Sequence, residues 1–246
     1  MIFIKNKFLY LFAIFVIWAF ISSFYDPIIL PSPYITFSAI LKIITSKDFI
    51  YTIGNTFLKM LVAILFTFIV GILLGLLMGL SQNIKNLFHP LIVFLQASPV
   101  ISFILLALIW FEPKTIPSFV LCINSFPNLA INVQEGINNI DKKLLQMSNF
   151  YKVDKIKLLK YFYIPSILSR ILAGISIILS NSFKIIVMAE VISKSPNGIG
   201  SKINWAWLNI ETEYILAWTI LIIFFTYILE KYTLVFIKKL IGSFYA

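Results

Sequence analysis

The sequence predicts an all-α integral membrane protein with about six transmembrane helices and both termini in the cytoplasm. Of its 246 residues, 60% are hydrophobic and only 12% are charged, whereas soluble domains average roughly 45–50% apolar and about 25% charged residues. Six stretches approach the roughly 20 apolar residues that a helix needs to cross a bilayer. Short loops separate them, so residues 1–246 are expected to form one transmembrane domain with its core at about 52–236.

The expected spans are, in chain order, about 8–24, 57–80, 90–111, 116–134, 166–193 and 214–236. The first has a short apolar core and resembles a signal peptide in this respect, but the topology of the remaining chain favours a retained span. In the second, Gly71, Gly75 and Gly79 recur every four residues, which predicts the close approach of another helix. Between these two spans, residues 34–47 are expected to form a short amphipathic helix on the outer surface.

The distribution of basic residues orients the chain, because lysine and arginine accumulate in cytoplasmic loops. With cytoplasmic termini, thirteen of the 20 basic residues lie inside, and one, Lys184, lies within a span. Six lie outside: Lys42, Lys47, Lys59, Lys114, Lys194 and Lys202. Trp205, Trp207 and Trp218 flank the sixth span on the outer side, as an interfacial aromatic belt does. The net charge of +10 is therefore interpreted as membrane anchoring rather than as nucleic-acid binding.

The sequence offers little catalytic chemistry. It contains one cysteine, Cys122, and one histidine, His89, so we expect neither an internal disulfide nor a metal site. It lacks the Gly-x-x-x-x-Gly-Lys-Ser/Thr loop that binds nucleotide phosphates. A membrane enzyme acting on lipids would need clustered Asp, His or Cys residues, which are not apparent in the sequence.

The longest charged segment, at about 135–165, separates the fourth and fifth spans and contains six lysines after Asp141. Asp141 and Asp154 are candidate N-caps for helices at 142–150 and 155–163. Ile164 is expected to leave the helical conformation because Pro165 follows it. The faces of both helices mix apolar residues with lysines. Docking of a soluble partner and contact with anionic lipid are both consistent with this pattern.

Polar residues inside the spans are candidates for a solute pathway. They are Ser98, Ser102, Asn124, Asn128, Asn132, Ser180, Lys184 and Glu190. The three asparagines are four residues apart and share one helix face; hydrogen bonding between helices is the alternative role. Lys184 is expected to face the interior or water, either beside an acidic partner or in the pathway. Glu190 lies about 120° around the helix from Lys184, so the two do not form an intrahelical pair.

Several motifs occur in order along the chain and resemble one family. They are Leu30-Pro31-Ser32-Pro33, Pro99 with Trp110-Phe111, Phe126-Pro127, Asn132, Gly136-Ile137, Asn139-Ile140-Asp141, Ala189-Glu190 and Gly198-Ile199-Gly200. With them, the chain resembles the permease subunit of type I binding-protein-dependent ABC importers, in the nitrate, sulfonate and taurine branch. The resemblance implies a multi-pass protein of the bacterial inner membrane that imports a sulfonate, a nitrate-like anion, or a vitamin or pyrimidine precursor.

The resemblance also assigns residues 135–165 as the coupling loop that contacts the ATPase. The positions carried over are Gly136, Asp141, Gln146, Met147, Ser148, Lys152, Asp154 and Pro165. The family's Glu-Ala-Ala triplet is Gln146-Met147-Ser148 here, and its glycine is Lys152. A left-handed turn at a lysine costs roughly 1–2 kcal/mol, so the turn geometry and the strength of coupling are expected to differ.

The implied partners are a cytoplasmic ABC ATPase dimer, a second permease subunit, an extracytoplasmic binding protein and the lipid bilayer, but no nucleic acid. ATP and magnesium are expected in the ATPase, and this chain is expected to carry no cofactor. The alternative interpretation is a non-transporting membrane scaffold or sensor that keeps a diverged docking loop.

Overall fold

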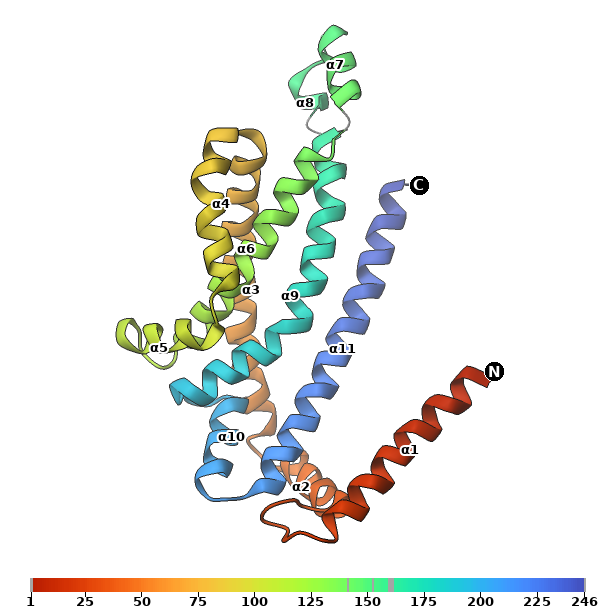
Figure 1. Ribbon diagram of the computed structural model, residues 1–246, viewed down its shortest axis with the longest axis vertical. Coiled ribbons are helices and arrows are strands. Elements are labelled where there is room, and N and C mark those ends of the chain that lie inside the picture. Colours follow the sequence, from red (N-terminus) through yellow and green to blue (C-terminus); the bar gives the residue numbers. More distant parts are fainter. Residues whose placement is uncertain (1, 141, 152, 159–161, 246) are drawn as a thin grey trace.

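The structure is a computed structural model that describes residues 2–140, 142–151, 153–158 and 162–245. These residues form helices and connecting loops, which confirms the all-α prediction (Figure 1). The helices are α1 (Ile2–Ser22), α2 (Pro33–Thr45), α3 (Phe49–Leu80), α4 (Gln82–Ala97), α5 (Val100–Trp110), α6 (Ile116–Asn138), α7 (Lys142–Phe150), α8 (Lys155–Leu158), α9 (Ile164–Ser193), α10 (Ile199–Leu208) and α11 (Thr212–Tyr245).

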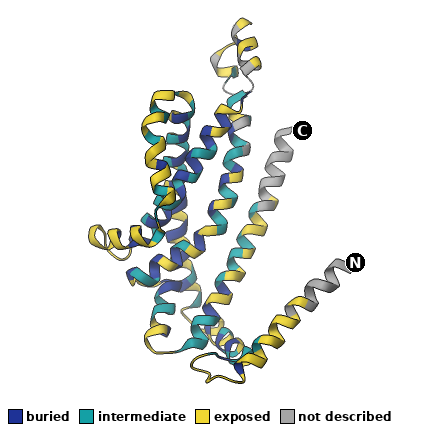
Figure 2. Ribbon diagram, viewed as in Figure 1, coloured by how far each residue is buried: buried dark blue, intermediate teal, exposed yellow. Residues whose placement is uncertain are grey.

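Helices α3, α6 and α9 form the packed centre of the bundle, where most buried residues lie (Figure 2). The glycines of α3 face α6, as their spacing predicted. A Cβ on Gly71 would lie 2.9 Å from Leu129 Cβ, and a Cβ on Gly75 would lie 2.6 Å from the Ala130 carbonyl oxygen. A methyl group at either position would therefore separate the two helices. The absence of side chains on this face of α3 lets the backbones approach closely.

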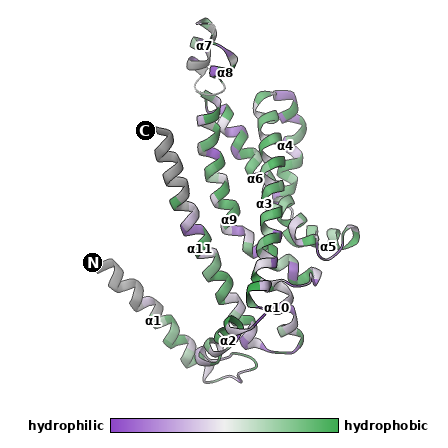
Figure 3. Cartoon of the chain, turned by 180° about the vertical axis from the view of Figure 1, so that it is seen from behind, coloured by the Kyte–Doolittle hydropathy of each residue, from purple (hydrophilic) through white to green (hydrophobic). Residues whose placement is uncertain are grey.

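Four described helices are long and apolar enough to cross a membrane: Phe49–Leu80, Ile116–Asn138, Arg170–Ser193 and Thr212–Thr233. Helices α4 and α5 together would supply a fifth. The apolar part of α1 within the described side chains, Phe12–Ser22, is shorter than a span. The described chain therefore provides four or five spans, fewer than the six expected. Hydrophobic residues cover the long helices of the bundle (Figure 3).

The expected continuous span at 90–111 is wrong. The chain bends by 100° between α4 and α5. Ser98 and Pro99 are extended there, with ψ of 135° at both residues. Proline lacks an N–H group, and its ring disfavours the helical conformation of the preceding residue. The helix therefore stops at Ala97 and restarts at Val100.

Helix α2 confirms the predicted short helix between the first two expected spans, while its position on the outer surface stays a prediction. It begins after Ser32, whose side chain accepts a hydrogen bond from Ile35 N (3.4 Å), and Pro33 occupies its first turn. Both features stabilise a helix start. Its buried residues, Thr36, Ala39 and Ile43, form one face, and α2 packs against α11.

Two further boundaries differ from expectation. Helix α3 begins at Phe49 rather than near residue 57, so its first turns contain polar residues that a hydropathy window excludes. Helix α9 begins at Ile164, so the expected departure of Ile164 from helix is wrong. Pro165 lies in the first turn of α9, where the missing N–H would have no intrahelical partner in any case.

Candidate functional site

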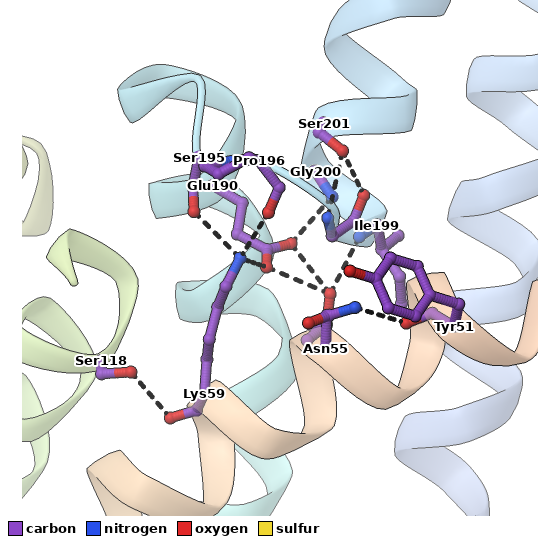
Figure 4. Close-up of polar contacts among 12 residues, drawn as sticks. Tyr51, Asn55, Lys59, Ser118, Glu190, Ser195, Pro196, Ile199, Gly200 and Ser201 are labelled. Carbon is purple, nitrogen blue, oxygen red and sulfur yellow. Dashed lines mark hydrogen bonds and ion pairs between the residues drawn. The ribbon is translucent and has the colours of Figure 1, made fainter. Parts of the chain in front are cut away.

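A buried ion pair joins α3 and α9, and its carboxylate also contacts α10 (Figure 4). Lys59 on α3 lies 2.8 Å from Glu190 Oε1 on α9. The Lys59 ammonium also donates to Ser195 Oγ (2.9 Å) and to the Pro196 carbonyl oxygen (3.1 Å), both in the loop that follows α9. All three ammonium donors therefore have acceptors. The Glu190 side chain is fully enclosed and that of Lys59 is 9% exposed.

The remaining contacts of Glu190 come from α3 and α10. Thr56 Oγ1 lies 3.1 and 3.0 Å from the two carboxylate oxygens. The same hydroxyl accepts from Ile199 N (2.8 Å), while Gly200 N donates to Glu190 Oε2 (2.9 Å). The carboxylate therefore binds the first turn of α10, where free backbone N–H groups favour a negative charge.

Two glycines make room for this carboxylate. A Cβ on Gly198 would overlap the Glu190 carboxylate, and a Cβ on Gly200 would overlap Glu190 Cβ. The Gly198-Ile199-Gly200 sequence is thus explained by close approach to Glu190. We refer to Thr56, Lys59, Glu190, Ser195 and Gly200 as the outer clamp. Because its charges and donors are paired, the outer clamp fixes α3, α9 and α10 and leaves no open position for a metal or substrate.

The outer clamp bears on two expectations. Lys59, counted among the residues of an outer loop, lies inside α3 and is buried. Glu190, a pathway candidate, is fully buried in contacts within the chain, and its role in a pathway stays a prediction. Sequence reasoning missed the pairing, although a signal was present: a charged residue in an apolar helix needs a partner, and Lys59 and Glu190 are both such residues.

The asparagine stripe lies on one face of α6, as its spacing predicted. Asn124, Asn128 and Asn132 are half-buried. Asn132 Nδ2 donates to the Asn128 carbonyl oxygen (2.8 Å), and Gln96 Nε2 of α4 donates to Asn128 Oδ1 (2.7 Å). Asn132 also lies beside Gly174 of α9. The stripe is therefore bordered by α4 and α9, and its role in a pathway stays a prediction.

The other pathway candidates occupy different places. Ser98 and Ser102 flank the bend between α4 and α5, where Ser98 Oγ donates to the Phe94 carbonyl oxygen (2.8 Å). Ser180 Oγ donates to the Ser176 carbonyl oxygen (2.9 Å) within α9. Lys184 is exposed on α9. The acidic partner considered for Lys184 is not found among the described residues.

The segment between α6 and α9 projects from the end of the bundle opposite α2 and α10 (Figure 1). Helix α7 matches the predicted 142–150, whereas α8 is described only for Lys155–Leu158 of the predicted 155–163. The connection is closed by backbone bonds from Tyr151 N to the Met147 carbonyl oxygen and from Val153 N to that of Ser148, both 2.9 Å.

The outcomes at the individual positions of this segment vary. Asp141 and Lys152 lie outside the described residues, so the first N-cap and the turn at the family's glycine position stay predictions. Asp154 precedes α8, and its carbonyl oxygen accepts from Leu158 N (2.9 Å). Gln146, Met147 and Phe150 are exposed, whereas Gly136 and Ser148 are buried. Exposed apolar and polar side chains thus share this projection, as a docking surface requires.

The described part of the chain contains no group of three His, Cys, Asp or Glu residues able to hold a metal ion. Cys122 is half-buried and free.

Comparison with known proteins gives consistent matches. The family model described as "binding-protein-dependent transport system inner membrane component" matches residues 68–241. The taurine transport system permease protein of Escherichia coli (strain K12) is 22% identical over 211 residues, which cover 83% of this chain and 76% of that protein. The nitrate import permease protein of Synechococcus elongatus is 29% identical over 131 residues, 53% of this chain and 47% of that protein.

A solved structure shares the fold. A chain of the MetNI methionine ABC transporter, in an inward-facing conformation, superposes with a TM-score of 0.64 at 12% identity. The match covers 79% of this chain and 99% of that chain. The alignments with the nitrate and bicarbonate permeases span about half the length of those relatives.

Proposed function

Because this chain belongs to the family of binding-protein-dependent transport system inner membrane components, we propose that it forms the solute pathway of an ABC import system and couples it to a separate ATPase. The chain is a multi-pass permease subunit of the inner membrane.

The projecting segment α7–α8 is the proposed contact with the ATPase. It is continuous with α6 at one end and with α9 at the other, and both helices belong to the packed centre. A partner that moves α7–α8 would therefore move the asparagine stripe on α6 and Lys184 on α9. This direct continuity is the observation that carries the proposal. A movement of the ATPase on ATP binding would reach the pathway in this way, because packed helices shift as rigid units.

The proposed pathway runs along the asparagine stripe. Asn128 and Asn132 supply amide groups midway along a span, bordered by α4 and α9. The exposed ammonium of Lys184 adds a positive charge on α9. Amide donors together with a cation suit a small oxyanion. The named relatives include taurine, sulfonate and nitrate permeases, so we propose a small sulfonate- or nitrate-type solute.

The experiment is purification of the tagged chain with its associated proteins, followed by uptake into proteoliposomes. We expect an ATPase to co-purify, and we expect ATP-dependent uptake of taurine, an alkanesulfonate or nitrate when the cognate binding protein is added. Uptake that persists without the ATPase would refute the coupling. Co-purification of an ATPase without uptake of any solute in the panel would favour the scaffold or sensor.

Variants in the projecting segment separate docking from folding. Replacing exposed Phe150 by serine is expected to weaken ATPase recovery without changing the unfolding temperature of the chain. The matched control is Tyr232→Ser on α11, an aromatic side chain that is also strongly exposed. Equal ATPase recovery with both variants would place the docking surface elsewhere.

A further inference from the structure

A cleft lined by residues of α2, α3, α10 and α11 has no role in the proposed transport mechanism. Helices α2 and α10 lie at the end of the bundle opposite α7–α8 (Figure 1). The cleft has a volume of about 730 Å³ and lies between α2, the first turn of α3, α10 and the start of α11. Binding pockets for small molecules commonly measure about 300–1,000 Å³. The cleft is therefore too large for a bare ion and large enough for a polar group with an organic body. We call it the outer cleft.

The outer cleft lies where two apolar spans begin. The apolar spans Phe49–Leu80 and Thr212–Thr233 both begin at its edge. Tyr51, Trp205 and Tyr214 line it, and tyrosine and tryptophan gather at the headgroup level of membranes. Trp218, expected in an interfacial belt, instead lies buried in the wall. A lipid headgroup is thus the group that meets this cleft at the highest local concentration.

The charges of the outer cleft favour an anion. Lys42 and Lys202 line it, against one acidic residue, Asp48. Lys202 Nζ lies 3.7 Å from Asp48 Oδ2, with both side chains substantially exposed, so this pair holds Lys202 only weakly. Lys42, in the last turn of α2, forms no ion pair with any described residue. One positive charge therefore remains uncompensated.

The inner wall of the cleft is apolar. Ile43 and Trp218 are each 5% exposed, and the Trp218 ring stacks on Phe49 with 6.4 Å between ring centroids. Exposed apolar surface in the cleft comes instead from the rings of Tyr51 and Trp205, and a cationic rim beside exposed aromatic rings matches an amphiphile better than the side chain of an acidic protein. We propose that the outer cleft binds the headgroup of an anionic phospholipid, with its phosphodiester between Lys42 and Lys202 and its glycerol backbone against Tyr51 and Trp205.

The test uses the full chain, purified in detergent with its associated subunits. Phosphatidylglycerol and phosphatidylcholine with the same acyl chains are titrated separately, and bound lipid is counted by native mass spectrometry. We expect the wild type to prefer phosphatidylglycerol. Lys42→Gln and Lys202→Gln should each weaken this binding about fivefold, and the double variant about 30-fold. Lys47→Gln and Lys114→Gln, exposed lysines outside the cleft, should retain wild-type binding.

Four results would overturn the proposal. The first is equal binding of the two lipids by the wild type. The second is unchanged lipid preference in a double variant that unfolds at the wild-type temperature. The third is retention of inorganic phosphate in the cleft without displacement by phosphatidylglycerol, which would assign a free oxyanion. The fourth is loss of binding-protein association in the double variant with intact lipid preference, which would assign a protein partner. None of these outcomes depends on transport.

Discussion

Replacing Glu190 with glutamine tests whether the outer clamp holds α3, α9 and α10 together. Glutamine keeps the size of the side chain but removes its charge. Lys59 is then buried without a counter-charge, since its other two acceptors, Ser195 Oγ and the Pro196 carbonyl oxygen, are neutral. Removing one partner of a buried ion pair costs about 3–5 kcal/mol. We expect a loss of this size for Glu190→Gln and also for Lys59→Met.

The double variant Lys59→Met/Glu190→Met separates charge from packing. With no charge left, the main residual cost is the Gly200 N–H, which loses its acceptor. A buried unsatisfied donor costs about 1–3 kcal/mol. Additive effects of the two single variants would give about 6–10 kcal/mol. We therefore expect the double variant to be more stable than either single variant, with a coupling energy of at least about 3 kcal/mol.

The assay is reversible unfolding of the purified chain in mixed detergent micelles, followed by tryptophan fluorescence. Lys47→Met is the matched control because Lys47 is exposed and lies outside the clamp, so its effect should stay within about 0.5 kcal/mol. A double variant as unstable as the sum of the single variants would refute the reasoning. So would a loss below about 1 kcal/mol for Glu190→Gln.

Three further predictions follow from other parts of the bundle. Gly75→Ala should destabilise the chain by about 1–3 kcal/mol through overpacking against Ala130 and Val133. The control Gly54→Ala, with open space around residue 54, should not destabilise it. Equal unfolding transitions of the two variants would contradict the close approach of α3 and α6. Lys184→Met should lower the initial rate of anion uptake into proteoliposomes several-fold without impairing assembly; failure to assemble would instead show a structural role. Asn128→Leu should reduce uptake and remove the bond from Gln96, whereas uptake at the wild-type rate would exclude the stripe from the pathway.

Much of the architecture could be predicted from local pattern. Apolar runs located the helices, and the four-residue spacing of Gly71, Gly75 and Gly79 predicted a close helix contact that the structure confirms with α6. The short helix near residues 34–47 also followed from its amphipathic pattern and appears as α2. These features depend on residues within a few turns of each other, so a single sequence contains them.

Some helix boundaries differ from those expected because hydropathy and the effect of proline predict different things at the same position. The apolar run across residues 90–111 predicted one span, but Pro99 breaks it into α4 and α5 with a bend of 100°. In contrast, Pro165 is accommodated within the first turn of α9. The same residue type follows a helix end at Pro99 and lies in the first turn at Pro165, where the missing N–H costs no intrahelical bond. Pro90 and Pro127 lie inside α4 and α6, so the residue type alone does not decide whether a helix ends.

The sequence by itself determined that this chain is a helical membrane protein with a charged projection between two central helices. Hydropathy and charge fix these properties because the bilayer selects apolar segments whatever their neighbours are. Only the tertiary structure decided that Lys59 pairs with Glu190, 131 residues away. Many polar partners are available in a sequence, and only the packing of α3 against α9 and α10 brings these two within 2.8 Å and excludes water from them.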